Sequence, residues 1–288
     1  MTQFKKAERL EEVAEQASPD PLEPGDPRYV DISDGRGTTE LKELWLCLDD
    51  HSARANRFAA IAFTGHRGCG KSTELLRLEH VLEEESRFTP LHLYVDDSLL
   101  RDCDYPDLLL WLVERLARDF ADRGMPLNEK LVDNVVSWFA EKAVEDVKQL
   151  KAEATTELEA EGSTSASLYW VSIKALTRLK SMMQGSVERR STIRRRLQNF
   201  SSELVDNVNL LLDDARRVLG EKGREPDLLI VQDNLDRVPA EVGRRLFCDN
   251  GELLQRLRAH VVYTVPVAMV LAPYDVGQVF ENRFTMPM

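Results

Sequence analysis

Short apolar runs alternate along the chain with segments whose apolar residues recur at helical spacing. Four runs are apolar almost throughout, which is typical of strands that are buried on both faces of a parallel sheet. These runs are residues 58–64, 91–95, 228–232 and 261–265. Helical spacing of large apolar residues marks the segments between them. The main helical segments are residues 71–84, 106–124, 131–139 and 204–218. The alternation predicts a three-layer α/β fold around a parallel sheet.

Changes in local composition divide the chain into four parts. Charged residues followed by prolines predict an exposed helix in 1–17 and then an extended linker, so that 1–37 form an N-terminal tail. Thr38 would cap the next helix. The first part of the core is expected at 38–124, a polar helical insertion at 125–200, and the second part of the core at 201–288. A break at Gly162–Ser165 is expected within the insertion.

Overall composition narrows the class of protein. Hydrophobic residues make up 43% of the 288 residues, enough for a sizeable core, and the net charge of −12 argues against a surface that coats nucleic acid. The chain has neither a run of about 18 apolar residues nor a signal-peptide pattern, so we expect a cytoplasmic protein without a membrane partner. Four scattered cysteines suggest neither disulfides nor a zinc site.

A phosphate-binding pattern stands between the first apolar run and the helical segment that follows it. The sequence Gly65-His66-Arg67-Gly68-Cys69-Gly70-Lys71-Ser72 matches G-x-x-x-x-G-K-[ST], the Walker A motif, and Thr73 follows it. Glycines let backbone N–H groups turn into one hollow, and the helix adds its partly positive end. Lys71 would reach the β- and γ-phosphates of ATP, and the hydroxyl of Ser72 would hold Mg²⁺.

An acidic segment follows the third apolar run, where a P-loop protein needs a carboxylate beside its metal. Residues 228–233 end in Asp233, and Asn234, Asp236 and Arg237 come directly after it. Together with the phosphate loop, this segment resembles the P-loop ATPases of the AAA+, STAND and KAP type (the ASCE group, with a Walker B strand). KAP members carry Asp-Asp-Leu-Asp-Arg at this point. The resemblance extends over residues 58–95 and 225–288 and is poor between them.

The resemblance implies an ATPase that uses Mg-ATP, with Asp233 on the metal side of the site. Asn234 stands where these ATPases have the carboxylate that polarises the attacking water, and an amide orients a water without taking its proton. Hydrolysis would therefore be slow unless Asp236 substitutes. Asp236 and Arg237 would otherwise form a structural cap or salt bridge.

Two weaker matches extend the resemblance toward the end of the chain. Thr264 falls at the sensor 1 position beside the γ-phosphate, or is an ordinary strand threonine. Arg283 resembles the arginine that some AAA+ subunits project into a neighbour's site, or is a surface residue. A fifth strand is expected to begin at Met286, and the lid that follows in these ATPases is missing, so we expect a fragment of a longer bacterial protein.

A basic cluster in the insertion offers a contact to nucleic acid or to an acidic partner. It consists of Arg189, Arg190, Arg194, Arg195 and Arg196. The alternative is a solvated face that balances the acidic residues at 141–161, and this alternative is favoured because few aromatics lie nearby to stack on bases.

Four functions are consistent with these features. The first is an ATPase that drives a partner or its own self-association, and the second is a slowly hydrolysing nucleotide switch. The third is a nucleic-acid-linked or antiviral defence ATPase, which the resemblance and the arginine cluster suggest. A small-molecule kinase is the fourth, and it is least favoured because the insertion lacks a paired acid and basic clamp for an acceptor.

Overall fold

We analysed a computed structural model of the chain. It describes residues 9, 20–31, 40–54, 57–143, 147–160, 167–271, 274 and 276–287. The expected helix in 1–17, the cap at Thr38 and the break at Gly162–Ser165 lie outside the described residues.

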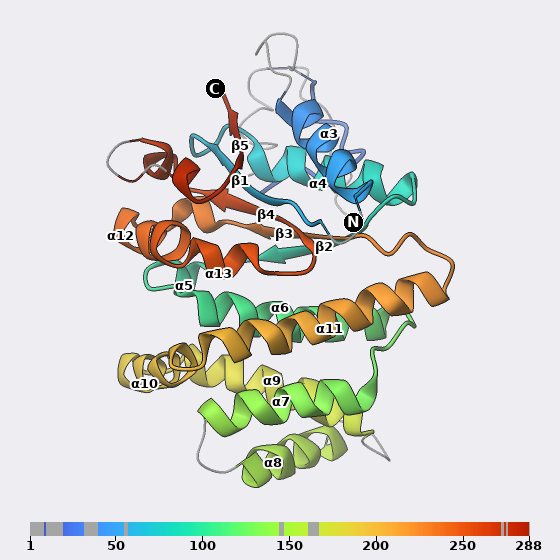
Figure 1. The fold of residues 1–288 in the computed structure, drawn as a ribbon, viewed down its shortest axis with the longest axis vertical. Helices are drawn as coiled ribbons and strands as arrows, with labels where there is room; N and C mark the ends of the chain where they lie inside the picture. The colour runs from blue at the N-terminus through green and yellow to red at the C-terminus, as the bar shows by residue number, and fades with distance from the viewer. Residues whose placement is uncertain are drawn as a thin grey trace.

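A sheet of five parallel strands forms the centre of the fold, in the order β2-β3-β4-β1-β5 (Figure 1). The strands are β1 (Ala60–Gly65), β2 (Thr89–Tyr94), β3 (Leu228–Asp233), β4 (His260–Val265) and β5 (Asn282–Met286). The first four confirm the strands predicted from the apolar runs. Because these strands lie between helical layers, both of their faces are buried, and this burial explains why their sequences are apolar almost throughout.

The expectation for the fifth strand was wrong. Strand β5 ends at Met286 instead of beginning there, and it pairs with β1 along the edge of the sheet. Its residues alternate between exposed and more buried positions, with Arg283 and Thr285 exposed. A half-buried edge strand of this kind lacks the apolar run by which the other strands were found.

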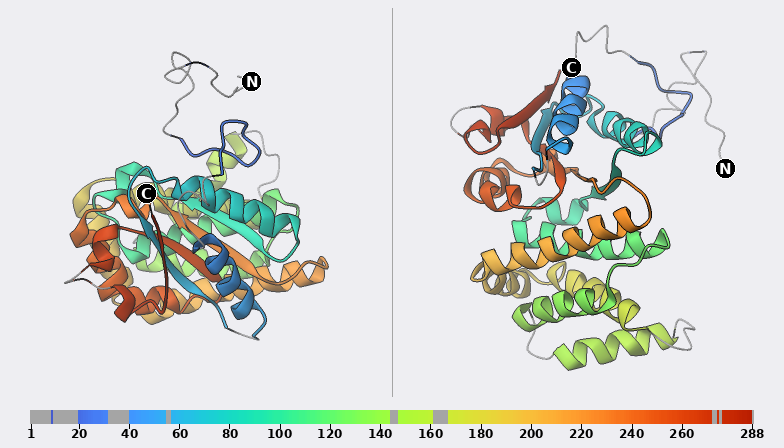
Figure 2. Two further views of the ribbon diagram at one scale, coloured as in Figure 1. Left: turned by 90° about the horizontal axis from the view of Figure 1, so that it is seen from above. Right: turned by 45° about the vertical axis from the view of Figure 1, so that its right-hand side comes forward.

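Helices cover both faces of the sheet, as the three-layer prediction requires (Figures 1 and 2). Helices α3 (Glu40–Ser52) and α4 (Lys71–Glu84) pack through Leu44, Leu48 and Leu75 on the face that carries Ile61 and Phe63. The opposite face is covered by α6 (Tyr105–Asp122), α11 (Ser201–Glu221), α12 (Ala240–Gly243) and α13 (Gly251–Gln255). The short helix α5 (Asp97–Leu100) follows β2.

Four more helices lie beyond α6 and α11, on the side away from the sheet (Figure 1). They are α7 (Glu129–Ala143), α8 (Val147–Ala160), α9 (Leu168–Met183) and α10 (Val187–Gln198). Their buried residues belong to the same hydrophobic core as the face of the sheet beneath α6. Three 3₁₀ turns (η1, Leu235–Arg237; η3, Val267–Val270; η4, Val276–Gln278) and a π-helical segment (η2, Arg244–Asp249) complete the described structure. No helix in the described ranges is long and apolar enough to cross a membrane.

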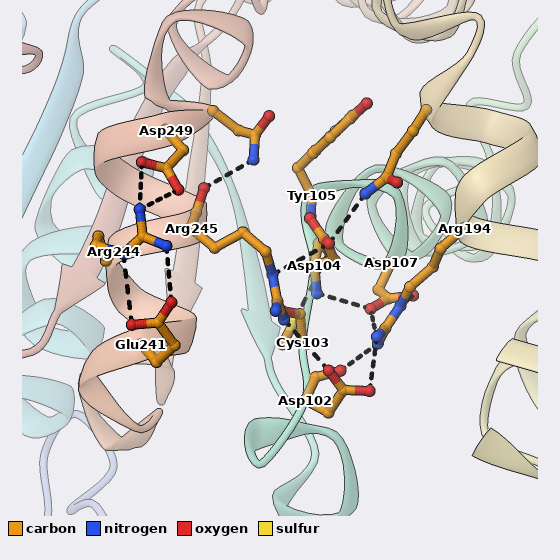
Figure 3. A network of polar contacts seen from close by, with 12 residues as sticks. Asp102, Cys103, Asp104, Tyr105, Asp107, Arg194, Glu241, Arg244, Arg245 and Asp249 are labelled. Atoms are coloured by element: carbon orange, nitrogen blue, oxygen red, sulfur yellow. Dashed lines mark hydrogen bonds and ion pairs between the residues drawn. The ribbon is translucent and has the colours of Figure 1, made fainter. Parts of the chain in front are cut away.

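A network of arginines and aspartates joins α10 and η2 to the N-terminus of α6 (Figure 3). Arg194 donates to Asp107 and to Asp102, with Nε 3.1 Å from Asp107 Oδ1 and Nη1 2.8 Å from Asp102 Oδ2. Arg245 of η2 reaches Asp102 and lies 3.2 Å from Asp104 Oδ2. Burial raises the pKa of Asp107 to about 6 although Arg194 opposes the shift.

The basic cluster is divided between surface and core: Arg189, Arg195 and Arg196 are exposed, whereas Arg190 and Arg194 turn toward the α6 side. Arg194 is buried, with 6% of its surface exposed, so it is not available to nucleic acid. Arg190 also pairs with Asp102, at 3.4 Å. Within the acidic stretch, Glu153 and Glu157 pair with Arg178 of α9. Sequence proximity missed these pairings because every partner lies on another helix or in the turn before α6.

We expect Arg194→Ala to destabilise the fold by about 3–5 kcal/mol, because it leaves the Asp107 carboxylate buried without its counter-charge. The neighbouring Arg195 is exposed, so Arg195→Ala should change the free energy of unfolding by less than about 0.5 kcal/mol. Urea unfolding of both variants measures the difference. Equal losses in the two variants would contradict the burial of this pair.

Candidate functional site

The predicted phosphate loop connects the carboxyl end of β1 to the N-terminus of α4. Gly68 and Gly70 have φ angles of +82° and +92°, in the left-handed region that glycine adopts without a steric cost. Gly70 precedes the first residue of α4, so the unpaired N–H groups of that helix begin at the loop. The strand, loop and helix needed for a phosphate cradle are therefore present in this order.

Gly65 allows the end of β5 to approach the loop closely. A Cβ atom at this position would lie 2.8 Å from the carbonyl oxygen of Met286 and 3.0 Å from Cys69 Sγ. Any larger residue would have to displace the backbone of β5, which makes Gly65 a packing requirement.

Lys71 points back into the loop and is held by three oxygens. Its Nζ donates to the carbonyl oxygens of Gly65 and His66, both at 3.0 Å, and lies 2.8 Å from Asp236 Oδ2. Only 5% of Lys71 is exposed. An ammonium has three donors, so these three oxygens satisfy it completely. Asp236 is thus brought to the lysine by the turn that follows β3.

Asp233 ends β3 and is buried, with 1% of its surface exposed. Its Oδ1 accepts a hydrogen bond of 2.7 Å from the backbone N–H of Asn234. Its Oδ2 lies 3.6 Å from His92 Nε2, beyond normal hydrogen-bond length, and has no hydrogen-bond partner among the described residues. Burial alone would raise the pKa of Asp233, but His92, the Ser72 hydroxyl and the Asn234 N–H outweigh it and lower this pKa.

His92 is a residue of this region that the sequence analysis missed. It lies on β2, where its Nδ1 is 2.9 Å from Glu79 Oε1 of α4 and its Nε2 faces Asp233. Burial lowers the pKa of His92, but the two carboxylates more than compensate and raise it to about 9. The sequence did contain one sign of this role, because His92 is a titratable residue between Leu91 and Leu93 in a predicted buried strand.

The side-chain amide of Asn234 makes three hydrogen bonds within the protein. Its Nδ2 donates to the Val95 carbonyl at 2.8 Å and to Asp97 Oδ1 at 3.1 Å, and its Oδ1 accepts from Arg237 at 3.0 Å. Its backbone is left-handed, with φ of +73°, a region in which asparagine is enriched among non-glycine residues. Asn234 therefore fixes the turn and the ends of two strands, and both N–H donors of its amide are used within the protein.

Thr264 and Arg283, the two weaker matches to the ATPase pattern, lie outside the cleft over the phosphate loop. Thr264 is buried, and its hydroxyl accepts from the Leu235 N–H at 3.0 Å, so it supports the turn after β3. Arg283 lies within β5, and its guanidinium packs directly against Gly277, where a side chain would collide with it. Neither residue lines the cleft described next.

A cleft of about 1040 Å³ lies over the loop at the carboxyl edge of the sheet. From the loop and the start of α4, the cleft is lined by Arg67, Gly68, Gly70, Lys71, Ser72 and Thr73. The segments that follow β2 and β3 contribute Tyr94, Asp96, Asp97, Asn234, Asp236 and Arg237.

The remaining lining residues of the cleft are Asp20, Pro21, Leu22 and Arg28. These residues belong to the segment predicted as tail and linker, but 20–31 pack against α4. The Leu22 N–H donates to Thr73 Oγ1 at 3.1 Å, and the Tyr29 hydroxyl to Glu74 Oε1 at 3.0 Å.

Comparison with known proteins found no match to this chain among family models, curated proteins or solved structures.

The raised pKa of His92 makes its contribution to stability depend on pH. Because the folded pKa of about 9 exceeds the ordinary 6.5, the contribution is complete below pH 6.5 and is lost as pH rises through about 9. Without metal, the advantage of the natural chain over His92→Gln should shrink by up to about 3 kcal/mol between pH 6 and pH 10. Denaturant titrations measure it, with the half-exposed His80→Gln as the control. A constant difference would contradict the buried pairing.

Proposed function

We propose that the chain is a P-loop ATPase that binds Mg-ATP in the cleft and hydrolyses it. The observation that carries this proposal is the contact of two acidic residues with the phosphate loop: Asp236 pairs with Lys71, and Asp233 interacts with the Ser72 hydroxyl. Nucleotide binding at the carboxyl ends of parallel strands is the general rule for open α/β sheets. A protein partner or a second copy of the chain would use the resulting conformational change.

The residues beside the loop fit a divalent cation. The buried Oδ2 of Asp233 has no hydrogen-bond partner in the described structure, and the hydroxyl of Ser72 lies against the same carboxylate. Carboxylate and hydroxyl oxygens are ligands that Mg²⁺ prefers. Asp233 and Ser72 would hold the ion, which would neutralise charge on the β- and γ-phosphates.

The chain's own residues suggest how the γ-phosphate would be attacked. The phosphates would replace Asp236 as the partner of Lys71, because they bring more negative charge to the ammonium. The released Asp236 carboxylate would accept a proton from the attacking water. The water oxygen bonds to the γ-phosphorus, the bond from that phosphorus to the bridging oxygen breaks, and ADP leaves beside inorganic phosphate.

Asp236 is favoured over Asn234 as the base by two observations. Asp236 contacts Lys71 directly, whereas the Asn234 amide is occupied by Val95, Asp97 and Arg237. Replacing Asn234 by glutamate would place a negative charge beside Asp97 and remove two donated hydrogen bonds. The slowly hydrolysing switch remains the alternative, because Asp236 also neutralises Lys71 before nucleotide binds.

Phosphate release and ATP binding test the proposal. We expect Lys71→Ala to lose ATP affinity, and Asp236→Asn to bind ATP but lower kcat by about 10²–10⁴-fold, the usual worth of a general base. Asn234→Glu should not speed turnover. The exposed Asp50→Asn serves as the control for Asp236→Asn. Tight binding without phosphate release by the natural chain would favour the switch, and no binding would refute both functions.

A further inference from the structure

We propose that Arg237 is the arginine that stabilises the γ-phosphate during hydrolysis, acting within the same chain. This inference rests on the proposed ATPase function. Arg237 directly follows Asp236, whose carboxylate contacts Lys71, and it lines the same cleft as Lys71 and Ser72. A guanidinium there would face the charge that develops on the γ-phosphoryl oxygens.

Three hydrogen bonds hold the Arg237 guanidinium beside the cleft. Its Nη1 donates to Asp97 Oδ1 at 2.6 Å and to Asn234 Oδ1 at 3.0 Å, and its Nη2 donates to Asp97 Oδ2 at 3.2 Å. The planar fork of arginine binds carboxylate and phosphate with the same two-donor geometry. Asp97 thus occupies the donors that a phosphate would need.

The pair between Arg237 and Asp97 is of a kind that a phosphate would displace. The side chain of Asp97 is 66% exposed and that of Arg237 is 28% exposed. Exposed ion pairs add little stability, whereas a triphosphate brings several negative charges into the cleft. Asn234 also accepts a hydrogen bond from the Arg237 guanidinium. Asn234 itself is held by its hydrogen bond to the Val95 carbonyl, which does not depend on Arg237.

Other arginines are less suited to this role. Arg283, selected from the sequence, packs on Gly277 in β5 and does not line the cleft. Arg28 is paired with Asp26 in the N-terminal segment, and Arg67 is exposed on the loop.

Two substitutions distinguish a role in the reaction from a structural salt bridge. We expect Arg237→Ala to lower kcat by at least about 10³-fold, the worth of an arginine finger, with an ATP Kd within about tenfold of the natural chain. Affinity for ADP with aluminium fluoride, which imitates the transferred phosphoryl group, should fall with kcat. Asp97→Asn removes the competing carboxylate, so it should raise kcat/KM by up to about fivefold.

Arg237→Lys keeps the charge without the fork and should recover only part of the rate. Arg244→Ala is the matched control, because it breaks an exposed ion pair outside the cleft and should leave kcat unchanged. An equal loss in Asp97→Asn and Arg237→Ala would overturn the inference in favour of a structural pair. Full activity of Arg237→Ala would overturn it while leaving the ATPase proposal intact, and failure of the natural chain to bind ATP would overturn both.

Discussion

Because all five strands run in the same direction, the segments that follow β1, β2 and β3 leave the sheet at one edge. Residues far apart in the chain meet there for this reason alone. Lys71 after β1, Asp97 after β2 and Asp236 after β3 line one cleft, although the insertion and α11 separate the second from the third. The parallel arrangement therefore assembles the site, and the loops supply its chemistry.

Two buried networks pair charges that lie on different elements. His92 lies between Glu79 of α4 and Asp233 of β3, and Arg194 of α10 reaches Asp107 of α6. A buried carboxylate without a partner is costly, so each network constrains where its helix lies against the core. The two networks hold the layers on opposite sides of the sheet.

Local patterns in the sequence predicted the features that depend on residues close together in the chain, namely the buried strands and the phosphate loop. Strands buried on both faces have a recognisable apolar composition, and the glycines and lysine of the phosphate loop have a fixed spacing. Strand β5 was misplaced because one edge strand carries too few apolar residues. The roles of His92 and Asn234, the burial of Arg194 and the packing of 20–31 on α4 depend on partners that are distant in sequence, and one-dimensional patterns contain no record of them.

The contact at Gly65 joins the phosphate loop to the last strand of the sheet. With the Met286 carbonyl so close to Gly65 that no side chain fits between them, the loop and the end of β5 cannot move independently. The phosphate loop and the end of β5 are therefore rigidly connected at this contact. A rotation of the loop by even a small angle would shift the backbone at Met286, so a displacement of the phosphate loop would reach the edge of the sheet through this contact.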